Sequence, residues 1–129
     1  MDKFNIPIKF KDSYEGLAES SGLLSMDDNQ FIIQFETKDA FLGVIKSGLK
    51  TIQIPLKNVI ELGYKKSIFG NKITILVDDL SYIEEVPNRD NNQVTLIIER
   101  KHIETAIDFV RAIRLDQSEK EYNQGMKNG

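Results

Sequence analysis

The sequence contains no cysteine, one histidine and no apolar run long enough to cross a membrane. Without cysteine, disulfide bonds and thiolate chemistry are excluded, and nothing points to an oxidising compartment. A spanning helix needs ~20 apolar residues in succession. The N-terminus MDKFNIPIKFKD has neither the unbroken apolar stretch nor the small-residue cleavage site of a signal peptide. These absences favour a soluble cytoplasmic protein.

The sequence also has no excess of positive charge, since the formal net charge is −3 at pH 7. Nucleic-acid-binding domains are usually basic, so this balance argues against a general nucleic-acid partner. The chain has no glycine-rich phosphate loop, no nucleophile elbow and no Ser/His/Asp order of a catalytic triad. We therefore expect a protein that is not an enzyme and that has no catalytic residues.

Candidate metal ligands are not arranged as a site. His102 is the only histidine, and the carboxylates near it do not have the paired spacing of a ligand cluster. Adjacent residues of a strand point to opposite faces, so the acidic pairs are expected to be solvated loops. These pairs are Asp27-Asp28, Asp78-Asp79 and Glu84-Glu85. We expect no metal and no cofactor.

Most of the 129 residues alternate between apolar and polar with period two, which is typical of strands with one buried face. The alternation predicts strands over 4–10, 31–36, 51–56 and 94–99, and Asp27-Asp28-Asn29 predicts a turn before the second of these. Pro7 cannot donate a ladder hydrogen bond, which places the first strand at a sheet edge.

The stretch YKKSIFGNKITI (64–75) predicts a hairpin. If Gly70-Asn71 is its two-residue loop, Phe69 pairs with Lys72 and Ile68 pairs with Ile73. In this register a common face points to the core and Phe69 projects outward. That face comprises Ile60, Leu62, Tyr64, Ile68, Ile73, Ile75 and Val77. Lys66 is the exception on it, and its stem could extend to water.

The period then changes to that of a helix. Ile103, Ala106, Ile107, Val110 and Ile113 predict one amphipathic helix over 101–116, followed by a polar, flexible tail over 117–129. The fold class predicted is mainly β with one C-terminal helix: a strongly bent antiparallel sheet or partly open barrel capped by that helix. One domain covers 1–116, with its core over 16–116 and an N-terminal edge strand over 3–11.

Four segments in this order carry a family resemblance: IPLKNVIEL (54–62), KKSIFGNKITI (65–75), VTLIIER (94–100) and HIETAIDFVRAIRL (102–115). Over roughly residues 16–116 the chain resembles bacterial PH-like and GRAM-like domains of the pleckstrin-homology superfold. The resemblance implies a binding or scaffolding module. It also equates MDDNQ (26–30) with the loop that carries lysine and arginine in phosphoinositide-binding members. Here that loop is acidic and would repel a phosphorylated headgroup.

Two candidate interaction surfaces follow. The first is the hairpin tip with Lys65, Lys66, Phe69 and Lys72, where one aromatic side chain stands among cations. Burial of the ring with attraction of the lysines to an anionic leaflet supplies roughly 5–6 kcal/mol, an affinity near 0.1 mM. The structural alternative is that Phe69 folds over its own hairpin or meets the segment over 41–45. The second surface is an outer apolar patch, if Ile32, Leu76 and Ile97 converge.

The leading hypothesis is a non-catalytic PH-like interaction module that binds protein or peptide through a sheet edge or outer face and forms a homo-oligomer. The alternative is weak peripheral membrane binding through Phe69 and its lysines, made useful by multivalency. A third hypothesis is that a small apolar ligand binds inside the barrel, which the many bulky inward residues disfavour.

Overall fold

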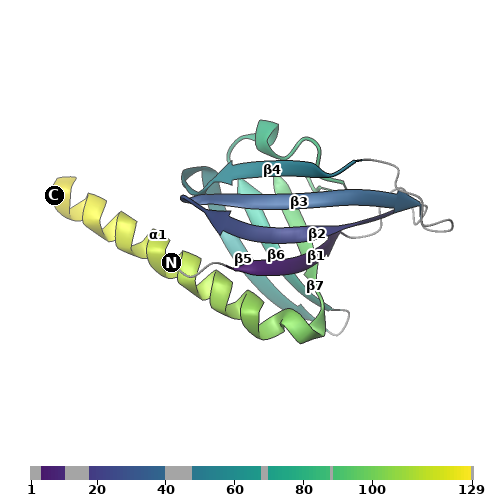
Figure 1. The fold of residues 1–129 in the computed structure, drawn as a ribbon. Helices are drawn as coiled ribbons and strands as arrows, with labels where there is room; N and C mark the ends of the chain where they lie inside the picture. The colour runs from purple at the N-terminus through teal and green to yellow at the C-terminus, as the bar shows by residue number, and fades with distance from the viewer. Residues whose placement is uncertain (1–3, 11–17, 40–47, 68–69, 88, 129) are drawn as a thin grey trace.

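The structure is a computed structural model that describes residues 4–10, 18–39, 48–67, 70–87 and 89–128. These residues form one antiparallel sheet, which is not closed into a barrel, and a C-terminal helix (Figure 1). The strands are β1 (Asn5–Phe10), β2 (Ala18–Asp27), β3 (Gln30–Asp39), β4 (Lys50–Pro55), β5 (Val59–Ser67), β6 (Gly70–Val77) and β7 (Gln93–Ile98). Helix α1 spans Ile103–Asn128, and three short 3-10 turns are η2 (Leu56–Asn58), η3 (Leu80–Tyr82) and η4 (Arg100–His102). The predicted fold class, a PH-like bent sheet capped by a helix, is confirmed.

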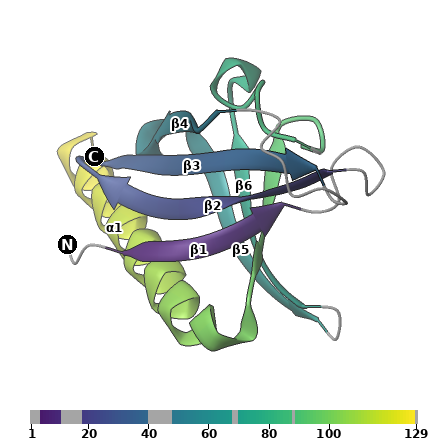
Figure 2. The same cartoon turned by 45° about the vertical axis from the view of Figure 1, so that its right-hand side comes forward.

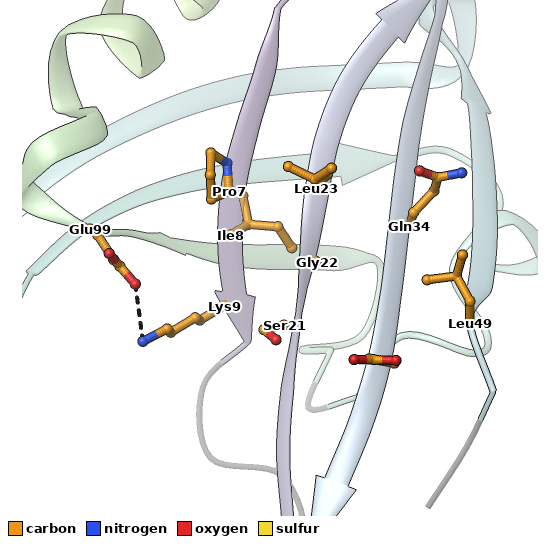
Figure 3. Close-up of a pocket in the computed structure, with 10 residues that line it drawn as sticks. Pro7, Ile8, Lys9, Ser21, Gly22, Leu23, Gln34, Leu49 and Glu99 are labelled. Carbon is orange, nitrogen blue, oxygen red and sulfur yellow. Dashed lines mark ion pairs between the residues drawn. The ribbon is translucent and has the colours of Figure 1, made fainter. Parts of the chain in front are cut away.

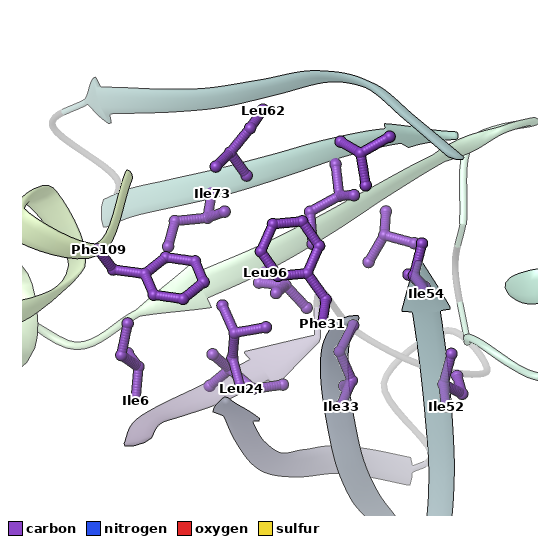
Figure 4. Packing of buried hydrophobic residues seen from close by; sticks show 14 of the residues in the cluster. Ile6, Leu24, Phe31, Ile33, Ile52, Ile54, Leu62, Ile73, Leu96 and Phe109 are labelled. Carbon is purple, nitrogen blue, oxygen red and sulfur yellow. The ribbon is translucent and has the colours of Figure 1, made fainter. Parts of the chain in front are cut away.

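The sheet has two halves, which meet at β1 and β7. Its strand order is β4-β3-β2-β1-β7-β6-β5, and within the described ranges two residue pairs, Lys9 with Ile97 and Phe10 with Leu96, join the halves. The halves turn toward each other and enclose apolar side chains from both (Figure 4). The core therefore lies inside the bend, and the other face of every strand is outward.

The period-two pattern is confirmed in the strands. On β3, Phe31, Ile33 and Phe35 are buried, and on β7 Val94, Leu96 and Ile98 are buried. The predicted turn between β2 and β3 is also present. Asp28 and Asn29 have φ of 46° and 64°, the left-handed conformation that a two-residue hairpin loop requires.

The register predicted for the β5–β6 hairpin is wrong. Ser67 pairs with Gly70 and Tyr64 with Ile73, so the two residues between the arms are 68 and 69. The shift is an even number of residues, so most of the expected inward side chains still face the core. Ile60 does not, because the register shifts between Val59 and Glu61 and leaves the Ile60 side chain 59% exposed. The predicted positions of Ile68 and Phe69 lie outside the described residues.

The prediction that Pro7 marks an edge strand is also wrong. β1 lies between β2 and β7 in the sheet. Its pairing with β2 covers Asn5 to Lys9, whereas its pairing with β7 begins only at Lys9. Pro7 therefore precedes the second ladder, and a central strand tolerates the missing N–H at this position.

Helix α1 closes the open end of the bent sheet with its first turns (Figure 2). Ala106, Phe109, Val110 and Ile113 are buried, and the Phe109 ring lies 5.4 Å from the Phe4 ring and 5.6 Å from the Phe31 ring. The helix continues past the predicted end at 116 to Asn128, and its last turns project away from the sheet (Figure 1). Residues 117–128, which lie in the segment predicted as a flexible tail, belong to this helix.

An arginine of the helix covers part of one sheet edge. β5 is the last strand of the sheet, and Arg114 donates from Nε and from an NH2 nitrogen to the Leu62 carbonyl oxygen at 3.1 and 2.9 Å. These bonds occupy a backbone acceptor that an edge strand would otherwise offer to another chain. At the opposite edge, β4 pairs with β3 alone.

Candidate functional site

A groove of about 530 Å³ crosses the outward face of β1, β2 and β3 and ends at the residue before β4 (Figure 3). Two leucines lie along it with much of their surface in water: Leu23 is 40% exposed and Leu49 is 66% exposed. Its lining residues are Pro7, Ile8, Lys9, Ser21, Gly22, Leu23, Gln34, Glu36, Leu49 and Glu99. Apolar and charged side chains are thus within reach of one bound segment.

On β2, the outward residues of the groove are Ser21 and Leu23. Ser21 has a short side chain and pairs with Lys9 and Glu36, and Leu23 pairs with Pro7 and Gln34 of the flanking strands. Gly22 allows a close approach of two strands. A Cβ at this position would overlap the Gln34 carbonyl oxygen and lie 2.7 Å from the Phe35 Cα atom. The backbones of β2 and β3 can approach in this way only at glycine.

Ion pairs flank the groove on two sides. Lys9 Nζ lies 3.1 Å from a Glu99 carboxylate oxygen (Figure 3). Lys101 Nζ lies 3.6 Å from the other oxygen. The hydrogen bond and the charge of Lys9, with the charge of Lys101, hold the pKa of Glu99 below its ordinary value. Farther along, Glu36 pairs with Lys38 at 3.5 Å. Both acidic side chains that line the groove are therefore already in ion pairs with lysines.

The structure brings together three of the predicted site residues, Lys65, Lys72 and Ile97. Lys65 of β5 is the cross-strand neighbour of Lys72 of β6, and Lys72 is the cross-strand neighbour of Ile97 of β7. The exposed side chain of Lys66 follows Lys65 along the strand. Phe69, the aromatic residue of the predicted tip, lies outside the described residues.

The predicted apolar patch of Ile32, Leu76 and Ile97 does not form. Leu76 pairs with Gln93, four residues along β7 from Ile97. Ile32 lies on β3, and β2 and β1 separate that strand from β7. The period-two pattern placed all three outward, but it gave no information on the order of the strands.

The sequence predicted no role for the groove residues. The adjacent Leu23-Leu24 pair carries one usable signal, since one of two neighbouring strand residues must face outward. Leu49 precedes its strand and gives no such signal. Which outward residues become neighbours depends on the register of β1 with β2 and of β2 with β3, and the alternation within a single strand does not fix that register.

The family resemblance equated residues 26–30 with the headgroup-binding loop of phosphoinositide-binding PH domains, and this prediction is wrong. The acidic turn over 26–30 joins β2 to β3, so it is not the loop between the first two strands of the sheet. That loop comprises residues 11–17 and lies outside the described residues. The acidic turn therefore gives no argument about phosphorylated headgroups.

Within the described ranges, no three histidine, cysteine, aspartate or glutamate side chains are grouped as a metal site. His102 is half-buried in η4, and its backbone N–H donates to the Glu99 carbonyl oxygen at 2.9 Å. No helix of the described chain has both the length and the apolar composition of a membrane span. Comparison with family models, with curated proteins and with solved structures gives no match.

Proposed function

We propose that this protein is a non-catalytic, PH-like interaction module that binds a segment of a partner protein in the outer-face groove. The observation that carries the proposal is the groove itself, with Leu23 and Leu49 exposed along it. Exposed apolar side chains in a concave surface favour a partner that removes them from water. The core side chains fill the inside of the bend, which supports binding on the outer face.

The groove alone provides a weak site. The exposed fractions of Leu23 and Leu49 together amount to about one leucine side chain, whose burial contributes ~1.5–3 kcal/mol. An apolar side chain of the partner contributes a similar amount, and ordering of the bound segment opposes both. Since 1 mM corresponds to about 4 kcal/mol, the apolar contacts give an affinity on the order of 0.1–1 mM. Tighter binding needs polar contacts or several linked copies.

Selection from a random peptide library displayed on phage tests the proposal. Wild-type protein is expected to enrich peptides with apolar residues. Leu49→Asp is expected to abolish that enrichment, because it places an unpaired carboxylate at the apolar rim. Leu115→Asp is the matched control, since Leu115 is 62% exposed on α1 and outside the groove. Enrichment of the same peptides by wild type and Leu49→Asp would overturn the proposed site.

We propose in addition that the protein self-associates through β4, whose open edge favours this role. In the described part of the chain, no backbone hydrogen bond joins the outer side of β4 to a further strand. Because Arg114 covers an acceptor at the β5 edge, β4 is the more available edge for a second copy. Pairing of β4 with β4 of that copy forms a closed dimer. Light scattering should give a dimer mass for wild type and a monomer mass for Thr51→Lys/Gln53→Lys. A wild-type monomer at all concentrations would contradict this role.

A further inference from the structure

Six outward residues form a continuous row across the sheet, from the β5–β6 hairpin to the groove. Each is the direct cross-strand partner of the next: Lys65, Lys72, Ile97, Lys9, Ser21 and Glu36. We call this set the outer row. Its last three members also line the groove. A segment bound in the groove can therefore continue over Ile97 to the two lysines.

The lysine end of the outer row carries positive charge that no described carboxylate pairs with. Like charges directly opposite each other destabilise a sheet, and Lys65 and Lys72 are such a pair. Among the described residues, no carboxylate forms an ion pair with either, whereas Lys9, Lys38 and Lys101 each have one. The net charge of the chain is −3, so this cluster is not a result of a generally basic composition.

From these observations we infer that the groove binds an acidic protein segment, with an apolar side chain at Leu23 and Leu49 and carboxylates at Lys65 and Lys72. The inference rests on the proposed function and adds the chemistry of the partner. Neighbouring strands are about 4.8 Å apart, so about 14 Å separates β2 from β6. An extended segment covers that distance with about four residues. The partner therefore carries its acidic residues about four positions from its apolar residue.

Charge complementarity favours such a segment over an anionic membrane. Glu36 and Glu99 line the groove end of the outer row, and their ion pairs already neutralise the lysines described there, so this end offers little attraction to a surface that is negative everywhere. A short segment fits this arrangement because it can place an apolar residue there and acidic residues only over Lys65 and Lys72. Each peptide carboxylate then lies beside a lysine that has no ion-pair partner in the described chain.

The peptides enriched on wild-type protein provide the test. We expect an apolar residue followed about four positions later by two or more acidic residues. A synthetic peptide of the enriched sequence should bind at least about ten-fold more tightly than its twin with asparagine and glutamine in place of the acids. Lys65→Gln and Lys72→Gln should each weaken the acidic peptide about two- to five-fold and leave the twin unchanged. Lys57→Gln, the same change of charge in η2 at the other end of β5, should have no effect.

Lys65→Glu separates a binding role from a structural one. It places opposite charges across the β5–β6 pair, so the melting temperature should rise while affinity for the acidic peptide falls. If Lys65 served only to stabilise the sheet, the melting temperature and the peptide affinity would not change in opposite directions. Raising salt from roughly 50 to 500 mM should bring the wild-type affinity close to that of the double variant Lys65→Gln/Lys72→Gln.

The remaining outcomes distinguish the two proposals. Enriched peptides that lack acidic residues and lose binding to Leu49→Asp would leave the proposed function in place and overturn the acidic partner. Absence of any enrichment would overturn both. Vesicles of about four parts phosphatidylcholine to one part phosphatidylserine are the second probe. Lysine-dependent sedimentation with them, together with no peptide affinity, would assign the lysines to a membrane surface.

Discussion

Phe109→Ala is expected to lower the free energy of unfolding by about 3–5 kcal/mol. The Phe109 side chain is fully buried, and its ring contacts those of Phe4 and Phe31 between the helix and the sheet. Its removal leaves a cavity at the point where α1 closes the open end (Figure 4). At roughly 4 °C per kcal/mol for a domain of this size, the melting temperature should fall by about 12–20 °C. Calorimetry or denaturant titration measures the change.

Leu115→Ala is the matched control, because it also shortens an apolar side chain of α1. Leu115 is 62% exposed, so its replacement should change stability by no more than about 0.5 kcal/mol. Equal losses for the two variants would mean that Phe109 does not attach the helix to the core. The closure of the sheet by α1 would then need another explanation.

A second large effect is expected for Gly22→Ala. The added methyl group would overlap the Gln34 carbonyl oxygen, and the neighbouring atoms belong to the backbone of β3. A flexible side chain could rotate away, but a backbone can relieve the overlap only by moving the strand. The β2–β3 ladder includes ten residue pairs, so this movement would disturb a large part of the sheet. We expect a loss of about 3 kcal/mol or more, measured by denaturant titration.

Gly48→Ala provides the comparison. A Cβ at Gly48 meets no atom of the described residues within 4 Å, and removing glycine restricts the unfolded chain, so this variant should be neutral or slightly stabilised. If Gly22→Ala has the same unfolding midpoint, the close approach of β2 and β3 is not required for the fold. Since Gly22 also lines the groove, a partly folded Gly22 variant should lose groove binding as well.

Local chemistry made much of the fold predictable. The alternation in β3 and β7 identified their buried faces, and Asp28-Asn29 formed the predicted turn. The helix was predicted in the correct place, but Phe109 was not assigned to its buried stripe. Ala106, Phe109, Val110 and Ile113 follow the spacing of one helix face, and the sheet decides how far that face is rotated.

The register of the β5–β6 hairpin could not be predicted from the residues around its turn. Gly70 follows the loop and has φ of 130°, a conformation that glycine adopts readily, but the sequence could not decide on which side of the loop it lies. Pro7 was misread for a related reason. A missing N–H excludes a ladder bond at one residue, yet β1 is central because its second ladder begins only after that residue. Proline does lack the N–H of a ladder hydrogen bond, as predicted, but the sequence did not show where the β1–β7 ladder begins.

The sequence by itself determined the type of each element and, for most residues, which face of a strand is inward, because turn chemistry and side-chain periodicity act between near neighbours. The tertiary structure alone decided that β1 joins the two halves and that Leu23 and Leu49 line one groove. It also aligned Lys65 and Lys72 with Ile97 and Lys9. These arrangements depend on pairing between segments distant in the chain. Such pairing is set by the packing of the whole core, which no short stretch of sequence contains.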